Sequence, residues 1–479
     1  MSSKKLETSP LLENLINASS STTISQSLAE KAPTDQYTPK IYKRRWWVLL
    51  VFCLCTFNKG ICWLIWKPLS DSFLIAYDWD VTEIGLASSL TSLSFVFLAL
   101  PVMYIVENHG VRAGVLLASA SLVLGCALWN LALHSKTFWL FLFGSTFIGV
   151  APTVTAVMPS LFSVTWFPVS QRTTATCICV LSLHASFIAG YVAGPQICDV
   201  SVTTSDVINR HNLSGLYVAE VRHGIESVGY FLTILTVVGL ILVIAYFPAS
   251  PPTPPSLCQT VKRIDFWPGL KRLARNRQYW MLITAFTMTN ATVYAWLPLI
   301  SVSFRHLGID EVTASWMSVY GTLVGTFALL LISFIADMRY FKRKTRAILK
   351  GFAVMSIVVL TLLACIQKEW IILADEAVIP TLYLLIILVN ISAQSIFPIC
   401  SEQACEYAYP VHEGLAGTVL MLGNGITAGI FYGLLLIPAL SEETIWMTLM
   451  CILGSCITLP LLILLKDDFR RLDLDEIKT

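Results

Sequence analysis

The side chains best able to do chemistry are polar or charged residues that interrupt long apolar stretches. Lys59, Trp63, Lys67 and Asp71 follow one another at intervals of four, which places neighbours on one face of a helix. Trp63 offers a π face to a cation or a planar ring, or sits in a lipid-facing belt. Lys67 and Asp71 are most simply an ion pair, with a solute-binding role as the alternative. A charged Lys59 beside Trp63 disfavours a quaternary ammonium and leaves room for a neutral or anionic aromatic solute.

Other isolated polar residues have the same two kinds of interpretation, structural or functional. His184 stands alone in an apolar stretch, where it is either a packed, hydrogen-bonded residue or a carrier of a transported proton. Asp71 is the second candidate for proton coupling. Thr287, Asn290 and Tyr294 fall on one helical stripe, which lines a cavity or forms hydrogen bonds between helices.

Twelve long apolar stretches between residues 46 and 465 must position these side chains. The 479-residue chain is 56% hydrophobic and only 13% charged, whereas soluble domains carry about a quarter charged residues. A helix of about 20 apolar residues crosses a bilayer, and these stretches are continuous and not alternating as in a barrel. The sequence therefore predicts an all-α membrane protein with twelve transmembrane helices in two six-helix halves.

The predicted spans form two sets of six. The first set lies at about 46–74, 81–105, 113–133, 137–162, 172–197 and 225–247, and the second at about 279–301, 313–336, 347–366, 378–401, 413–437 and 444–465. The corresponding domains are a disordered cytosolic tail with a sorting signal (1–45), a first helical half (46–247), a Pro-rich basic linker on the cytosolic side (248–278), a second helical half (279–465) and a short cytosolic tail (466–479).

The distribution of Lys and Arg predicts the sidedness. With a cytosolic N-terminus, most of the 32 basic residues fall on the cytosolic side, which leaves Lys59, Lys67, Lys136, Arg210, Arg222, Arg305 and Lys368 elsewhere. The positive-inside rule then places both termini in the cytosol. Lipid headgroups explain the basic clusters, so no nucleic acid is expected as a partner. Asn212, in the sequon Asn-Leu-Ser, then lies outside the cytosol as a glycosylation site.

The N-terminal tail contains a short sorting pattern. Glu7 precedes the pair Leu11 and Leu12 at the spacing of the acidic dileucine signal, which clathrin adaptors bind for delivery to endosomes and lysosomes. In an exposed cytosolic tail this pattern predicts a lysosomal membrane protein. The alternatives are a chance Leu pair and a location in the plasma membrane.

Other function classes find no support in the sequence. The 13 cysteines lie almost all within predicted spans, where Cys behaves as a small hydrophobe, so no metal site is predicted. No phosphate-binding Gly-rich loop and no Ser/His/Asp constellation is present, so we expect neither ATP-driven transport nor an enzyme, and no cofactor.

Two six-span halves joined by a cytosolic linker resemble the major facilitator superfamily, whose halves rock about a site near the bilayer midplane. Glu107 and Arg112, between spans 2 and 3, match a degraded form of the superfamily's acidic-basic-Gly-basic signature, and Asp337 and Arg339 occupy the counterpart after span 8. The resemblance implies cytosolic ion pairs that break as the halves rock. These residues are therefore predicted to form a gate.

Further motifs resemble solute carrier family 49, the feline leukaemia virus subgroup C receptor-related transporters. They include Lys59-Gly60-Ile61-Cys62-Trp63, Thr165-Trp166-Phe167 and the string Glu402-x3-Glu406-x2-Tyr409-Pro410-x2-Glu413-Gly414. Glu402 and Glu406 are expected to be structural or gating residues. The resemblance implies a monomeric secondary transporter, with proton-driven pyridoxine export from lysosomes as the specific expectation. The alternative is a choline, ethanolamine or haem-related carrier at the plasma membrane.

The resemblance also implies site residues. The family's choline-recognising members have a Trp at the place of Trp63 and a polar contact at the place of His184; a third polar contact falls at Gly425, with Asn424 beside it. The predicted substrate-binding set is Lys59, Trp63, His184, Asn290, Tyr294 and Asn424. A nutrient sensor that reports through its tails is an alternative of another class, but tails of about 45 and 14 residues favour transport.

Overall fold

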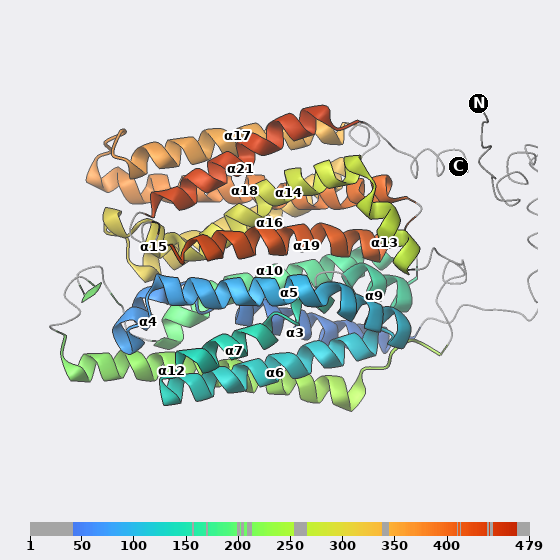
Figure 1. The fold of residues 1–479 in the computed structure, drawn as a ribbon, viewed down its shortest axis with the longest axis horizontal. Coiled ribbons are helices and arrows are strands. Elements are labelled where there is room, and N and C mark those ends of the chain that lie inside the picture. Colours follow the sequence, from blue (N-terminus) through green and yellow to red (C-terminus); the bar gives the residue numbers. More distant parts are fainter. Residues whose placement is uncertain are drawn as a thin grey trace, which may run out of the picture. The chain divides into compact units, whose positions relative to one another are not determined.

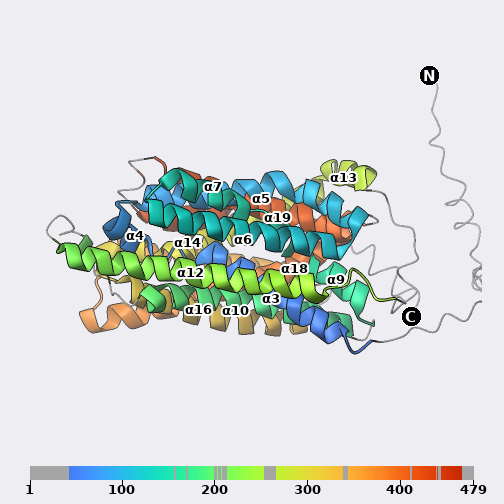
Figure 2. The same cartoon turned by 90° about the horizontal axis from the view of Figure 1, so that it is seen from below.

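Helices make up nearly all of the described chain (Figures 1 and 2). The computed structural model describes residues 42–155, 158–168, 171–198, 202, 206–207, 213–252, 266–337, 344–409, 411, 413–437, 440 and 444–466.

The helices of the first half begin at Arg45, the last residue of the basic cluster Lys43-Arg44-Arg45. They are α3 (Arg45–Leu64), α4 (Ser70–Tyr77), α5 (Val81–His109), α6 (Val111–Ser135), α7 (Phe138–Ile148), α8 (Pro152–Thr155), α9 (Met158–Trp166), α10 (Arg172–Cys198) and α12 (Gly215–Tyr246). A capping box starts α5, because Asp80 accepts from the Thr82 and Glu83 amides while Glu83 reaches back to the Asp80 amide.

The helices of the second half follow a short helix in the predicted linker. They are α13 (Phe266–Ala274), α14 (Arg277–Trp296), η4 (Leu297–Leu299), α15 (Ile300–Ser303), η5 (Arg305–Leu307), α16 (Glu311–Asp337), α17 (Thr345–Gln367), α18 (Asp375–Ala408), α19 (Glu413–Leu434) and α21 (Ile445–Leu464). The α13 helix lies within the predicted Pro-rich basic linker 248–278 and shows that this part of the linker is helical.

Ten of the described helices are long and apolar enough to cross a membrane. The two other predicted spans correspond to the segmented stretch α7, α8 and α9 and to α14, which carries Asn290 and several threonines. The prediction of an all-α protein with twelve transmembrane helices in two six-helix halves is confirmed.

Two predicted helices are interrupted. The span 46–74 is wrong as one continuous helix, since α3 ends at Leu64 and α4 begins at Ser70. Pro68 lies between them, and its missing N–H and fixed φ interrupt a helix. The span 137–162 breaks after Ile148, where Gly149 brings its backbone so close to α5 that a Cβ would lie 2.4 Å from the Thr91 carbonyl oxygen.

The two halves meet along two helix pairs, α5 with α19 and α10 with α16. In the first pair, Gly425 of α19 allows close approach, because a Cβ there would lie 2.5 Å from the Phe95 ring of α5. The helices α4 and α15 lie at one end of the bundle, and α9 and α13 lie at the other (Figures 1 and 2). The positive-inside rule predicts that the end with α13 faces the cytosol.

Candidate solute-binding cavity

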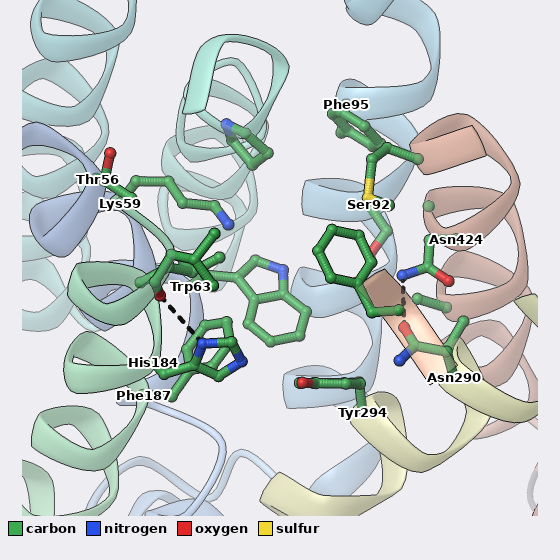
Figure 3. A pocket seen from close by; sticks show the side chains of 18 of the residues that line it. Thr56, Lys59, Trp63, Ser92, Phe95, His184, Phe187, Asn290, Tyr294 and Asn424 are labelled. Atoms are coloured by element: carbon green, nitrogen blue, oxygen red, sulfur yellow. Dashed lines mark hydrogen bonds between the residues drawn. The ribbon is translucent and has the colours of Figure 1, made fainter. Parts of the chain in front are cut away.

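A cavity of about 210 Å³ lies between the two halves. Its walls come from α3, α5, α8, α9 and α10 of the first half and from α14, α16, α18 and α19 of the second (Figure 3). The structure brings together in this one cavity all six predicted substrate-binding residues: Lys59, Trp63, His184, Asn290, Tyr294 and Asn424. No carboxylate is found among the described residues that line it.

Lys59 is the charged group of the cavity. It is only 8% exposed, and its ammonium points toward the space beside Trp63 (Figure 3). The Nζ atom lies 6.0 Å from the Trp63 ring centroid and 5.9 Å from that of Phe187. Within the described part of the chain, neither a hydrogen bond nor an ion pair reaches this ammonium. Because a buried charge without a partner is costly, an acceptor or anion supplied by a solute would be favourable here.

Lys67 lies outside the cavity and covers one face of Trp63. Its Nζ atom is 3.4 Å from the Trp63 ring centroid and 5.1 Å from that of Tyr432, and it donates a 2.7 Å hydrogen bond to the Trp63 carbonyl. The predicted ion pair between Lys67 and Asp71 is wrong. The break between α3 and α4 turns Lys67 back over Trp63 and directs Asp71 elsewhere.

Asp71 instead forms an ion pair with Arg305, which follows α15 in the other half. Beside it, the Glu311 carboxylate of α16 accepts hydrogen bonds from the Asp71 amide (2.6 Å), the Ser72 amide (3.1 Å) and the Ser72 hydroxyl (2.7 Å). The Glu311 carboxylate lies at the first turn of α4, so it also meets the positive end of that helix dipole. These contacts join the halves at the end of the bundle that contains α4. Asp71 does not line the cavity.

Sequence reasoning missed Arg305 and Glu311 as partners of Asp71. The ion pair joins residues 234 positions apart, so no local spacing reveals it. The one feature in the sequence that could have indicated these partners is their position, since Arg305 follows the seventh predicted span and Glu311 precedes the eighth. It also missed Phe187, although this residue follows His184 by three positions and therefore shares its helix face.

His184 presents a hydrogen-bond acceptor to the cavity. Its Nδ1–H donates to the Val180 carbonyl at 3.0 Å, so in the neutral ring the proton resides on Nδ1 and Nε2 keeps a lone pair. The side chain is buried and lies beside Trp63 (Figure 3). Phe187 packs edge-on against it, with ring centroids 6.1 Å apart. The ring can therefore accept a proton or a solute hydroxyl through Nε2.

The opposite wall is held by paired amides. Asn424 donates from Nδ2 to Asn290 Oδ1, and Asn290 donates from Nδ2 to the Ala393 carbonyl, each at 3.0 Å. The Oδ1 atom of Asn424 is buried without a partner in the described structure. Tyr294 points its hydroxyl across the cavity toward the side of His184 (Figure 3). Its ring lies 6.2 Å from Phe187, so aromatic contact bridges the two walls.

The other predicted functional residues are distributed differently. Arg112 and Glu402 are exposed, near the start of α6 and within α18, and Glu406 is buried in α18. Arg339 lies outside the described residues, as do the side chains of Glu107 and Asp337, so the cytosolic gate stays a prediction. The sorting residues Glu7, Leu11 and Leu12 and the glycosylation site Asn212 also lie outside them. In the described segments, no group of His, Cys, Asp or Glu side chains is arranged to hold a metal ion.

Known proteins similar to this chain are membrane transporters. The Major Facilitator Superfamily profile matches residues 48–432. The "Solute carrier family 49 member 4 homolog" of Xenopus tropicalis is 28% identical over 460 residues, which cover 92% of this chain and 95% of that protein. The "Choline/ethanolamine transporter FLVCR2" of Homo sapiens is 22% identical over 406 residues, or 83% of this chain and 73% of that protein.

Two solved structures share the fold. The Escherichia coli fucose:proton symporter FucP aligns with a TM-score of 0.58 and 16% identity, covering 88% of this chain and 98% of that one. The second structure is a bacterial homolog of the human lysosomal transporter Spinster in an inward-facing and unoccupied conformation. It aligns with a TM-score of 0.59 and 13% identity, covering 89% of this chain and 95% of that one. The chain therefore belongs to the major facilitator superfamily of membrane transporters and is similar to members of solute carrier family 49.

Proposed function

We propose that this protein is a secondary active transporter that exports a small aromatic solute of the pyridoxine type across the lysosomal or late endosomal membrane, driven by protons. The observation that carries the proposal is the cavity between the halves, where Trp63, Lys59 and His184 surround one space. Its volume of about 210 Å³ is below the range of roughly 300–1,000 Å³ typical of sites for drug-sized ligands, so a single-ring solute fits it better than a large one.

The cavity offers a contact for each part of such a solute. A flat ring stacks on Trp63 or Phe187, while the Lys59 ammonium and the Tyr294 hydroxyl donate to its oxygens. In its protonated form His184 donates from Nε2 to an oxygen of the solute, because Nδ1–H is already engaged by the Val180 carbonyl. Asn290 and Asn424 form the polar wall of the second half, so closing the halves around the solute completes its binding site.

His184 is the better placed of the two proton-coupling candidates. It lines the cavity with Nε2 unpaired among the described groups, whereas Asp71 is engaged by Arg305 outside the cavity. In the proposed cycle, an acidic lumen protonates His184 when the cavity opens to that side, and the proton leaves on the cytosolic side together with the solute. Outward proton movement thus drives export.

A choline or ethanolamine carrier at the plasma membrane is the second candidate. The similarity to FLVCR2 over most of the chain favours it. The two ammonium groups beside Trp63 oppose it, because they repel a cationic solute at the ring that would bind it. A haem-related solute finds little room in a cavity of this volume.

Redirecting the carrier to the cell surface tests both candidates. Changing Leu11 and Leu12 to Ala is expected to move the protein to the plasma membrane, where uptake of labelled pyridoxine and choline is measured at about pH 5.5 and about pH 7.5. Pyridoxine uptake is expected to rise at the acidic pH and to fall in Trp63→Ala and His184→Ala. The matched controls Trp370→Ala and His134→Ala change exposed residues away from the cavity and should retain uptake.

Choline uptake alone, unaffected by pH, would contradict the proposal and support the second candidate. Retention of the Leu11/Leu12 variant inside the cell would remove the sorting argument for the lysosome.

A further inference from the structure

Two aromatic rings from opposite halves enclose the ammonium of Lys67. Trp63 belongs to α3 and Tyr432 to α19, and their ring centroids lie 3.4 Å and 5.1 Å from Nζ. Both distances fall within the roughly 6 Å over which a cation is attracted to the face of an aromatic ring. Lys67 is 3% exposed, and within the described structure it forms no ion pair with a carboxylate. The protein therefore fills an aromatic cation site with a charge of its own.

The local backbone explains why this lysine reaches the ring. The helix α3 ends at Leu64, and the turn before Pro68 brings Lys67 back so that Nζ donates to the Trp63 carbonyl at 2.7 Å. An uninterrupted helix would have directed Lys67 along the axis toward Asp71. Asp71 is instead paired with Arg305, which leaves Lys67 to the rings.

A second ammonium reinforces the first. Lys59 lies four residues before Trp63, as Lys67 lies four residues after it. It faces the cavity, with Nζ 6.0 Å from the Trp63 ring centroid. No carboxylate among the described cavity residues balances it. A cation in the cavity would meet the Lys59 ammonium beside the ring, while the Lys67 ammonium covers the ring from outside the cavity. It would therefore gain little cation–π attraction and would be repelled by both charges.

We propose that Lys67 and Lys59 are the charge-selectivity residues of this transporter. Lys67 supplies a cation to the Trp63 and Tyr432 rings from outside the cavity, and Lys59 keeps cations out of the cavity itself. The protein consequently selects neutral or anionic planar solutes. This inference deepens the proposed function and rests on it for the role of the cavity in transport. According to this inference, Lys59 and Lys67 are the two side chains that distinguish this protein from a carrier of quaternary ammonium compounds.

Removing the charge at position 67 should create a binding site for an organic cation. The experiment measures the thermal stability of the purified full-length protein, and its dissociation constant, with choline and with tetramethylammonium as probes. The wild-type protein should show no stabilisation by either. Lys67→Met removes the ammonium but still covers that face of Trp63, so choline in the cavity no longer meets a repelling charge at the ring. It should bind choline at least about ten-fold more tightly than the wild type, and Lys59→Met/Lys67→Met more tightly still.

Two controls separate charge from packing. Lys67→Arg keeps a cation over the ring and should bind choline as weakly as the wild type. Lys271→Met removes a charge from the exposed face of α13 and should change nothing. If Lys67→Met does not fold, Lys59→Met carries the same expectation with a smaller gain, because it removes repulsion inside the cavity and leaves the ring contact intact.

The inference is overturned if folded Lys67→Met and the double variant bind choline no better than the wild type, or if the wild type binds choline as tightly as Lys67→Met. Its failure is distinguishable from that of the proposed function. A gain of cation binding in a protein that does not carry pyridoxine contradicts only the pyridoxine proposal, whereas pyridoxine uptake without any gain of cation binding contradicts only the selectivity inference.

Discussion

At the scale of single residues, the polar and charged side chains within apolar spans predicted which residues line the cavity. The sequence did not predict the partner of Asp71. Lys59 was predicted as a site residue because a charged side chain in a membrane helix needs a reason, and Trp63 and His184 because the resemblance to solute carrier family 49 implies ligand contacts there. All three line one cavity. The partner of Asp71 was predicted wrongly, because helical spacing favoured Lys67 and the true partner Arg305 is distant in the chain.

The ion pair between Asp71 and Arg305 should contribute to closure of its end of the bundle. Arg305→Ala leaves the Asp71 carboxylate, which is largely buried, without its cation, and we expect a loss of about 1 to 3 kcal/mol in the free energy of unfolding. Thermal unfolding of the purified variants measures it. Asp71→Asn combined with Arg305→Gln should recover part of the loss, since no unpaired charge remains; a double variant as unstable as the sum of the single ones would contradict the pairing.

At the scale of helices, the hydropathy of the sequence located the spans and could not locate their breaks. A window of apolar residues looks the same whether the backbone continues or turns, so the interruptions near Pro68 and Gly149 were missed. Both breaks matter for the cavity. The first turns Lys67 over Trp63, and the second brings the backbone at Gly149 against Thr91, which lines the cavity.

Gly149 should tolerate no side chain. A Cβ atom there would lie 2.4 Å from the Thr91 carbonyl oxygen, so α5 or the α7 break must shift. We expect Gly149→Ala to lower the free energy of unfolding by about 1 to 3 kcal/mol and to reduce transport through the displaced cavity wall. Gly351→Ala is the matched control, because nothing lies within 4 Å of a Cβ at that helical position. Equal stability of the two variants would contradict the close approach of α5.

At the scale of the whole molecule, the two-half architecture followed from the sequence because twelve hydrophobic spans and a basic linker leave few arrangements. The positive-inside rule also predicts an orientation, with α4 and α15 on the side away from the cytosol. In this orientation the Asp71–Arg305 and Glu311 contacts close the end away from the cytosol, and α13 lies at the cytosolic end. The proposed export cycle requires that orientation.

Glycosylation at Asn212 tests the orientation. If the segment before α12 lies outside the cytosol, the protein from mammalian cells should lose apparent mass on treatment with an N-glycosidase, and Asn212→Gln should remove the difference. Asn17→Gln removes a second sequon, Asn17-Ala18-Ser19, from the tail predicted to be cytosolic, and should leave the difference unchanged. A glycan that survives in Asn212→Gln and disappears in Asn17→Gln would invert the predicted topology.

The central claim is that the cavity carries a pyridoxine-type solute with protons. Its most direct measurement uses the purified protein in liposomes, with an outside pH of about 5.5 and an inside pH of about 7.5, and follows labelled pyridoxine. We predict uptake that stops when the pH difference is dissipated by an ionophore and that is lost in Trp63→Ala and His184→Ala but not in Trp370→Ala. Uptake that is absent, or equal in wild type and Trp63→Ala, would contradict the account.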